Sequence, residues 1–487
     1  MATSYQSPGV YVQEISHMPP AVYPANISMP LFIGYTEKNK REGAASRYHV
    51  NKISSIKEFE LAFGRDQHLS VHVQFNPDNS LAAPISISTR RFNMYEAITL
   101  YFNNGGGPCY IVSCGSFTAG RNATPGRRYR AMHAALDIAG GLGEACNIIF
   151  PDAGLLVEEI TVADSQETRQ QKTVLYHKLF KDALSVAELT RGFVLTDVYQ
   201  PKIPMAVNSL LGLYRTGMRD KLSAFGAAYF PNIKSSFPPY INEESYIAIT
   251  LEGGTGLPAR PVLRKETAGK AVFGSLFHHH LPEYQLIRNA IDQIRFTMPP
   301  SSAVAAVCAN VDNTRGCWKA PSNIPLSLVE GPTLPLTTLE MEGMNVSPDG
   351  ISVNAIRSFT GKGTMVWGAR TLLGNDNEWR YISVRRFANM IEVSVKKALL
   401  IFCFEPNGAA TWVKIKAMIE NFLILQWRNG ALMGATPREA FFVKTGLGET
   451  MTINDINEGR LVVEIGLAAT RPAEFIILKF TQQMPGP

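Results

Sequence analysis

The stretch from Glu474 to Gln482, "EFIILKFTQ", lies near the C-terminal end of the chain and has the pattern of a β-strand. Phe475 and Ile477 fall on one side of such a strand, and Ile476, Leu478 and Phe480 fall on the other. A strand that is apolar on both sides is typical of the middle of a sheet. Something must therefore cover this strand on both sides, either the same chain or a neighbour.

The N-terminal end carries a second extended segment. The run "SPGVYVQEI" at 7–15 alternates and opens with the turn pair Pro-Gly. The next stretch, 18–30, holds four prolines, which excludes a helix interior or a central strand. "LFIGYTEK" at 31–38 then predicts a buried strand. The chain thus has an extended apolar segment at each end.

The middle of the chain alternates strands and helices. "CNIIFPDAG" at 146–154 and "GFVLTDV" at 192–198 are strands that run into loops, with a helical pattern between them. A further helix and "SAFGAAYFPNI" at 223–233 follow. This order predicts an α/β layer with parallel pairing over about 140–330.

The last quarter has the clearest periodicity. Residues 381–407 predict a helix that the stretch "FEPNG" ends, with Val384, Phe387, Ile391, Val395 and Leu399 on its apolar face and Arg385, Glu392 and Lys396 on a polar face. A second helix follows over 411–430, with Thr411 as N-cap and Gly430 as the C′ residue. Its apolar residues spread too widely for one stripe, which indicates burial on several sides or an interface. Two strands, in "GRLVVEIGLAA" and "AEFIILKF", close the chain.

Composition narrows the class of protein. The chain has 487 residues, of which 45% are hydrophobic and 18% charged, an ordinary globular balance with a sizeable core. The apolar runs are too short for a membrane span, and the first 20 residues lack the features of a secretory signal. Six cysteines without a CxxC pair indicate reduced thiols in a cytosol.

The net charge of +6 is concentrated in the last quarter. Residues 355–487 hold 16 Lys and Arg against 11 Asp and Glu, a net charge of +5. Nucleic acid, an acidic protein surface and a simple solvated face are all compatible with this mild bias.

Three short motifs suggest ligand sites and do not meet the requirements for them. "GKGT" at 361–364 lacks the first glycine of a phosphate-binding loop, since Ile356 stands in its place. "NNGGG" at 103–107 fits a tight turn better than an anion-binding nest. The three histidines at 278–280 have no acidic or cysteine partner at ligand spacing, which favours a surface loop over a metal site.

The strongest indication of an enzyme is the pair Asp152 and Asp197. Each follows a strand of the expected parallel layer, and ligand sites in such layers lie beyond the strand ends. The alternative is that each Asp serves a turn or a cap. We therefore expect no catalytic, cofactor-binding or metal-binding residues and no enzymatic activity, because no nucleophile or phosphate motif accompanies the pair.

Four stretches together resemble one protein family. They are "SPGVYVQEI" with "LFIGYTEK", then "NNGGGPCYIV", then "VDNTRGCWKAPSN", and lastly the run from "VNAIRSFTGKGTMVWGARTL" to "AEFIILKF". The chain resembles the tail sheath proteins of contractile phages and of phage-tail-like contractile injection systems. Its opening and its single-chain layout resemble most the sheaths of extracellular injection particles.

The resemblance implies a division into a core and an insertion. Residues 1–35 and 355–487 would form an α+β core domain that lines the inner wall, and 36–354 an inserted outer domain. Terminal strands of neighbouring subunits would complete a small sheet in each core by β-augmentation. The residues expected in these intersubunit strands are Val10, Tyr11, Val12, Ile15, Val462, Val463, Ile465, Phe475, Ile476, Ile477, Leu478 and Phe480.

The resemblance also implies the partners. The chain would form a helical homopolymer of stacked six-subunit rings around an inner tube protein, with baseplate and terminal cap proteins at the ends. The basic last quarter would face an acidic tube through Lys396, Lys397, Lys414 and Lys416. We expect no cofactor, no direct nucleic-acid partner and no stable membrane insertion.

The expected function is that of a structural sheath subunit, which contracts and drives the tube through a target membrane. It would assemble in a bacterial cytoplasm and belong to a released extracellular particle or a virion tail. The alternatives are the sheath of a true contractile phage tail and, from a different class, an α/β enzyme that uses Asp152 and Asp197.

Overall fold

The computed structural model of the chain describes residues 21–39, 49–66, 71–75, 86–87, 92–238, 247–251, 260–262, 284–475 and 477. The chain forms two compact units. The larger comprises 26–390 with 469–487, and the smaller comprises 1–25 with 391–468.

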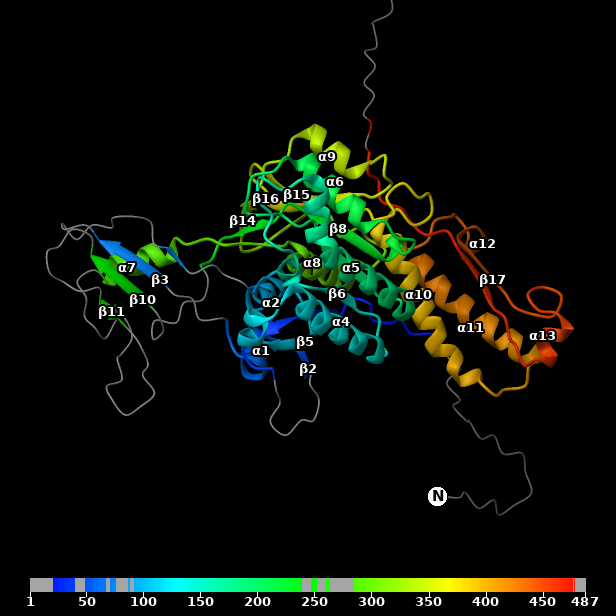
Figure 1. Ribbon diagram of the computed structural model, residues 1–487. Helices are drawn as coiled ribbons and strands as arrows, with labels where there is room; N and C mark the ends of the chain where they lie inside the picture. Colours follow the sequence, from blue (N-terminus) through cyan, green and yellow to red (C-terminus); the bar gives the residue numbers. More distant parts are fainter. Residues whose placement is uncertain are drawn as a thin grey trace, which may run out of the picture. The chain divides into compact units, whose positions relative to one another are not determined.

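A nine-stranded sheet forms the centre of the larger unit (Figure 1). The six inner strands are parallel, and the strands at its two edges are antiparallel to their neighbours. In spatial order the strands are β13 (Ile324–Pro325), β16 (Gly363–Trp367), β15 (Val353–Phe359), β8 (Gly226–Phe230), β7 (Phe193–Asp197), β6 (Asn147–Ile149), β1 (Pro30–Thr36), β5 (Cys109–Ser116) and β2 (His49–Ile53).

Both faces of this sheet are buried. All seven residues of β1 are buried, and they alternate between the two hydrophobic cores, with Leu31 and Ile33 in one and Phe32 in the other. Helices α4 (Pro125–Gly141), α5 (Gln166–Thr190) and α6 (Val207–Met218) contribute to the first core. The second core takes in α1 (Ile56–Phe63), α2 (Met94–Asn103) and α8 (Ser301–Arg315). Burial on both faces explains the continuous apolar runs of the inner strands.

The remaining helices and strands are shorter or belong to other layers. The helices are α1 (Ile56–Phe63), α2 (Met94–Asn103), α3 (Phe117–Asn122), α7 (Tyr284–Asp292), α8 (Ser301–Arg315), α9 (Thr338–Asn345), α10 (Ile382–Leu399), α11 (Ala409–Arg428), α12 (Pro437–Ala440) and α13 (Ile453–Asn457), with 3₁₀ turns η1 (Ala153–Leu156), η2 (Ser223–Phe225) and η4 (Leu400–Phe402). The smaller sheets comprise β3 (Val71–Phe75), β4 (Ser86–Ile87), β10 (Ile247–Leu251) and β11 (Arg260–Val262), then β9 (Ile233–Ser235), β12 (Thr297–Met298) and β14 (Val329–Pro332), and lastly β17 (Phe441–Lys444) and β18 (Glu464–Leu467).

The predicted parallel α/β layer is confirmed by the pairing of β6 with β7 and of β7 with β8. The same sheet also includes β1, β5 and β15, which lie outside residues 140–330. The expected assignment of 1–35 and 355–487 to an inner wall, and of 36–354 to an outer insertion, concerns the assembled particle and stays a prediction.

The two C-terminal helices form largely as predicted. The apolar face of α10 is buried at Val384, Phe387, Ile391 and Val395. Arg385, predicted on the polar face, is also buried, because its guanidinium stacks on the Trp379 ring with its central carbon 4.0 Å from the ring centroid. A polar residue can thus be buried where an aromatic ring covers it.

The caps of α11 differ from expectation at one end. Gly408 is the N-cap, and the predicted cap Thr411 lies inside the helix, where its hydroxyl donates to the Pro406 carbonyl. Gly430 has the left-handed φ of 79° that a C′ glycine takes, as predicted. The apolar residues of α11 differ in burial: Ile419 and Leu423 are buried, whereas Leu425 is exposed.

Several predicted features fall outside the described residues. They are the N-terminal strand residues Val10, Tyr11, Val12 and Ile15, the C-terminal strand residues Ile476, Leu478 and Phe480, and the histidines at 278–280.

Candidate assembly surfaces

A two-stranded antiparallel sheet lies in the smaller unit. The cross-strand pairs Phe441–Leu467 and Val443–Ile465 are apolar, and the pair Lys444–Glu464 is oppositely charged. Among the described residues, each of these strands has only the other as a sheet neighbour. A two-stranded sheet of this length is marginal alone, and an edge strand presents unpaired N–H and C=O groups. This sheet is therefore open to further strands.

One glycine determines how the two strands pack. A Cβ at Gly466 would collide with the ring of Phe442, its partner across the ladder. The Phe442 ring in turn lies 4.9 Å from the ammonium of Lys444 and remains half exposed. β18 lies within the strand predicted in "GRLVVEIGLAA", whereas β17 was not predicted, although "FFVK" at 441–444 carries a short strand pattern.

The predicted strand residues near β18 are placed differently from one another. Ile465 lies in β18 and pairs with Val443, whereas Val462 and Val463 precede the strand. The carbonyl of Val462 accepts a hydrogen bond from the Thr450 hydroxyl at 2.8 Å. Only Ile465 of these three thus takes part in the ladder within the subunit.

The C-terminal segment is held to the larger unit by a cluster around Glu474. Its carboxylate accepts two hydrogen bonds from the buried Arg370 guanidinium, at 2.9 Å from Nε and 2.7 Å from Nη2. Asn345 Nδ2 and the Tyr381 hydroxyl donate to the same carboxylate, at 2.6 and 3.2 Å. Burial acts to raise the pKa of Glu474, but these donors hold it below its ordinary value. We call this arrangement the Glu474 anchor.

Beyond the anchor the apolar residues are exposed. Phe475 is 70% exposed and Ile477 80% exposed, and neither they nor Glu474 belong to a strand in the single chain. The strand predicted over 474–482 is thus not formed at these three positions, and its other residues lie outside the described part. An anchored root followed by bare apolar side chains is the expected geometry of an arm whose sheet partner lies in another subunit.

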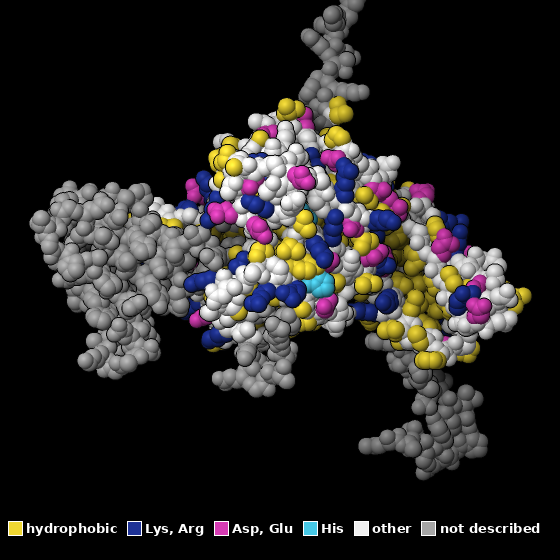
Figure 2. Space-filling view, viewed as in Figure 1, with side chains coloured by type: hydrophobic (Ala, Val, Ile, Leu, Met, Phe, Trp, Pro, Cys, Tyr) yellow, Lys and Arg dark blue, Asp and Glu magenta, His cyan; other side chains and the backbone are white. Residues whose placement is uncertain are grey.

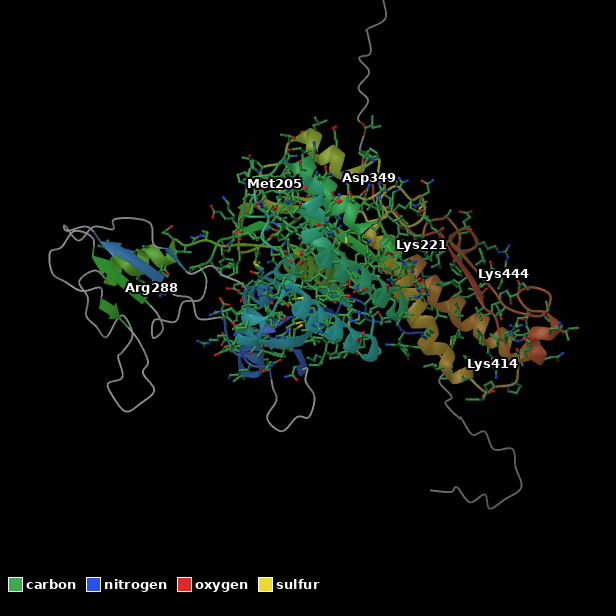
Figure 3. All side chains as sticks on the ribbon, viewed as in Figure 1. Met205, Lys221, Arg288, Asp349, Lys414 and Lys444 are labelled. Atoms are coloured by element: carbon green, nitrogen blue, oxygen red, sulfur yellow. The ribbon has the colours of Figure 1, made fainter. Side chains whose placement is uncertain are left out.

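Of the four lysines predicted to face a tube, Lys414 and Lys416 lie on different sides of α11. Lys396 and Lys397 are exposed at the end of α10. Lys414, which Figure 3 labels, is exposed on α11. Lys416 is half-buried, two positions after Lys414. Residues two apart in an α-helix point about 200° away from each other, so one flat partner cannot contact both equally.

An apolar surface at the turn between α10 and α11 was not predicted. Leu400, Ile401 and Phe404 are largely exposed there, and Phe404 has a left-handed φ of 72°. Val413 adds an exposed side chain from the first turns of α11. Hydrophobic side chains also gather around α11 in Figure 2. Large exposed apolar groups of this kind mark interaction surfaces.

The two aspartates at the strand ends serve the backbone. Asp152 makes no cap hydrogen bond to η1, and its carboxylate instead accepts from Tyr35 N at 2.8 Å and Asn93 N at 2.6 Å. It therefore links β1 to the start of α2 across the sheet edge.

Asp197 follows the neighbouring strand and accepts from Ser301 N at 2.9 Å, at the first turn of α8. Burial raises the pKa of this carboxyl group to about 7. Its side chain lines a cavity of about 130 Å³ together with Tyr176 and Gln200, whereas Asp152 is not among the lining residues. The structure thus gives the two carboxylates separate backbone contacts.

The other motifs have structural roles in the described residues. In "NNGGG", the N–H groups of Gly105 and Gly106 bond to carbonyls of α2, which is a helix-ending turn. "GKGT" forms the turn between β15 and β16, where Gly361 and Gly363 both have φ of 76°. Across the described ranges no group of three or more metal-ligating side chains is found, and no helix there has the length and hydropathy for crossing a membrane.

Residues 374–483 match the sequence profile of the phage tail sheath C-terminal domain family. The tail sheath protein of Vibrio phage KVP40 is 23% identical over 129 residues, which cover 26% of this chain and 19% of that protein. The match thus spans about a fifth of the phage protein's length.

Solved sheath structures match this chain over nearly its whole length. The sheath of the anti-feeding prophage in its contracted state is 27% identical, with a TM-score of 0.63, and the match covers 99% of this chain and 100% of that one. The sheath complex of PVC, an extracellular contractile injection system, in its contracted state has a TM-score of 0.62 at 24% identity and 99% coverage of both chains. A chain in the contracted baseplate of the anti-feeding prophage has a TM-score of 0.66 at 25% identity, covering 97% of each chain. The predicted resemblance and the mixed α/β sheath fold are confirmed.

Proposed function

We propose that this chain is the structural subunit of the contractile sheath of a phage-tail-like injection particle. It polymerises helically around an inner tube and contracts to drive that tube through a target membrane. The observation that carries the proposal has two parts. The β17–β18 sheet has no further strand among the described residues, and the C-terminal segment exposes Phe475 and Ile477 directly after the Glu474 anchor. The full-length similarity to contractile sheaths supports it.

The two features complement each other chemically. An edge strand of β17 or β18 offers main-chain hydrogen bonds, and an arm bearing Phe475 and Ile477 offers a strand with apolar side chains. Burial of each such side chain contributes roughly 1.5–3 kcal/mol. Adding a neighbour's arm to the sheet would pair the main-chain groups of the edge strand and bury the apolar side chains of the arm. The N-terminal segment 7–15 would supply a second strand.

The partners follow from the same proposal. Subunits stack as six-membered rings around the tube, and baseplate and cap proteins close the ends; similarity to a chain of the anti-feeding prophage baseplate assembly supports the baseplate partner. Assembly in a bacterial cytoplasm precedes release of the particle. The sheath performs no catalysis, which agrees with the use of Asp152 and Asp197 by backbone donors. Similarity to two extracellular or prophage-derived particles favours this particle type over a true phage tail.

The test is electron microscopy of the purified full chain and of a double variant, Phe475→Lys with Ile477→Lys. We expect long hollow cylinders from the unmodified chain and only free subunits from the double variant. The matched control is Leu61→Lys with Leu189→Lys, because both leucines are 81% exposed and lie on helices of the larger unit. Normal cylinders from the arm variant, or loss of cylinders from the control alone, would contradict the proposal.

A further inference from the structure

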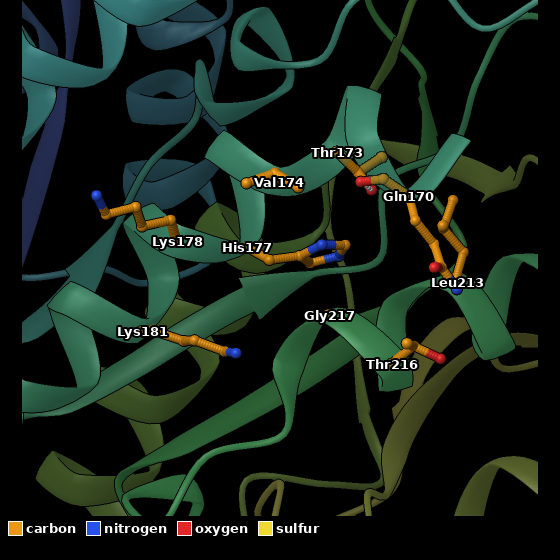
Figure 4. A pocket seen from close by; sticks show the side chains of 9 residues that line it. All are labelled: Gln170, Thr173, Val174, His177, Lys178, Lys181, Leu213, Thr216 and Gly217. Carbon is orange, nitrogen blue, oxygen red and sulfur yellow. Dashed lines mark hydrogen bonds between the residues drawn. The ribbon is translucent and has the colours of Figure 1, made fainter. Parts of the chain in front are cut away.

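A groove lies between α5 and α6 of the larger unit. Its volume is about 400 Å³. Helix α5 contributes Gln170, His177 and Lys181 at intervals of seven and four residues, so all three fall on one side of the helix (Figure 4). Helix α6 contributes Thr216 and Gly217 opposite them. We call this the α5–α6 groove.

The groove is shaped around the imidazole of His177. This side chain is only 6% exposed and packs against the rings of Tyr176 and Tyr214. A Cβ at Gly217 would collide with its Nδ1, so only glycine at that position leaves room for the ring. Burial, and secondly the charge of Lys181, lower the pKa of His177 to about 4, so the ring is neutral at pH 7.

The two threonine hydroxyls that line the groove donate to backbone carbonyls of their own helices, whereas three other polar groups of the lining have no such partner. Within the described residues, no hydrogen bond is found for the imidazole of His177, the amide of Gln170 or the ammonium of Lys181, although the imidazole is more than nine-tenths buried. A buried polar group without a partner costs free energy unless water or a ligand satisfies it. Figure 4 shows the His177 ring and the Lys181 side chain both directed toward Gly217 and Thr216.

The charge of the lining selects the class of ligand. Two lysines line the groove and no Asp or Glu does. Lys178 Nζ lies 5.1 Å from the centre of the Tyr129 ring and points away from His177, which leaves Lys181 as the cation beside the imidazole. An ammonium, an amide N–H and an imidazole N–H are all donors, and they suit a ligand that offers several acceptor oxygens with negative charge.

We propose that the α5–α6 groove binds an oxyanion, either a carboxylate or a phosphate, through Lys181, Gln170 and His177. The ligand is a free anion or an acidic group of a neighbouring protein, and its chemistry is the same in both cases. This site is separate from the arms and from the β17–β18 sheet, so it does not depend on the proposed function.

Isothermal titration calorimetry of the full chain with inorganic phosphate and with acetate tests the proposal. We expect saturable binding of at least one of them, with a Kd on the order of 1–10 mM, and at least about tenfold weaker binding in Lys181→Ala. Gly217→Ala should weaken binding similarly without removing any ligand group, because the new methyl group displaces the imidazole. The charge-matched control is Lys221→Ala, since Lys221 is exposed and does not line the groove.

The outcomes separate the site from general charge effects. Absence of saturable binding, unchanged binding in both Lys181→Ala and Gly217→Ala, or equal loss in Lys221→Ala would each overturn the proposal. Repeating the titration on assembled sheaths distinguishes the two sources: phosphate binding that disappears on assembly indicates an acidic group of a neighbour, and unchanged binding indicates a free anion. Failure of this inference and failure of the proposed function are distinguishable. If the chain assembles into sheaths but binds no anion, only this inference is wrong.

Discussion

At the scale of single residues, the buried carboxyl group of Asp197 makes stability depend on pH. Burial raises its pKa to about 7, whereas an Asp in an unfolded chain titrates near a pH of about 3.9. Between these values the folded chain holds a proton that the unfolded chain has released. Stability from this group is therefore full below a pH of about 4 and falls as the pH rises to about 7.

We expect Asp197→Asn to remove this component of the pH dependence while it keeps an acceptor for Ser301 N. Urea unfolding at pH values of about 4.5 and 8 measures it, on either side of the folded pKa. The unmodified chain should lose more stability between the two than the variant does. An exposed carboxylate changed in the same way, Glu378→Gln, serves as control and should track the unmodified chain. Parallel pH profiles for all three proteins would refute the expectation.

Asp152 contributes through geometry. Its carboxylate bonds to the backbone N–H groups of Tyr35 and Asn93, which lie 117 and 59 residues away in sequence. Asp152→Ala would leave buried donors without their partner, at about 1–3 kcal/mol each. We expect a loss of about 2–5 kcal/mol in unfolding free energy, measured by denaturant titration, against less than about 0.5 kcal/mol for the exposed Asp137→Ala. Sheaths should still form below the lowered melting temperature, and failure to assemble from a folded variant would point to a further role.

At the scale of elements, the Glu474 anchor determines where the C-terminal arm leaves the body. Glu474→Ala removes acceptors from Arg370, Asn345 and Tyr381 and leaves a buried guanidinium with only backbone carbonyls. Because hydrogen bonds to charged groups contribute about 1.5–3 kcal/mol, we expect destabilisation of that order and fewer or shorter cylinders. Thermal melting and electron microscopy measure the two effects. Glu378→Ala, an exposed carboxylate near the same cluster in sequence, should change neither.

The basic side chains of α10 and α11 can be tested separately, because Lys414 and Lys416 point in different directions. We expect Lys396→Glu with Lys397→Glu, and Lys414→Glu alone, to weaken assembly templated by the tube, and Lys416→Glu to do less. Each exposed ion pair contributes only about 0–1 kcal/mol, but every subunit repeats it along a sheath. Co-expression with the tube protein, followed by imaging, measures the frequency of tube-filled particles. A normal frequency in the charge-reversal variants would exclude these helices as the tube contact.

At the scale of the whole molecule, the proposed function predicts that the terminal segments connect subunits and that the rest of the chain folds without them. The described chain after residue 20 reaches the smaller unit first, where Ala25 N donates to the Ser394 hydroxyl at 2.8 Å. Residues 1–18 precede this point and the Pro-rich stretch. We expect removal of 1–18 to leave circular dichroism and melting temperature nearly unchanged while abolishing cylinders. Loss of the fold in this truncated chain would show that the segment belongs to its own subunit.

The local sequence pattern was sufficient to predict the helices and strands whose residues interact mainly with near neighbours in sequence. The apolar runs of β1, β6 and β7, the buried face of α10 and the C′ glycine at 430 were all predicted from the sequence. Spacing along a helix or strand places side chains on a face whatever the rest of the chain does. The resemblance to contractile sheaths likewise rested on the order of several such segments.

Only the tertiary structure decided what depends on distant segments. The carboxylate of Asp197 meets Ser301 N across 104 residues, and Glu474 meets Arg370 across the same separation. Gly217 is required by the ring of His177 on another helix. A residue's own sequence neighbours do not specify such a partner, because only packing of the two segments brings the atoms within hydrogen-bonding or van der Waals distance. For that reason the sequence alone indicated two aspartates that could be catalytic, and the fold showed them holding the backbone together.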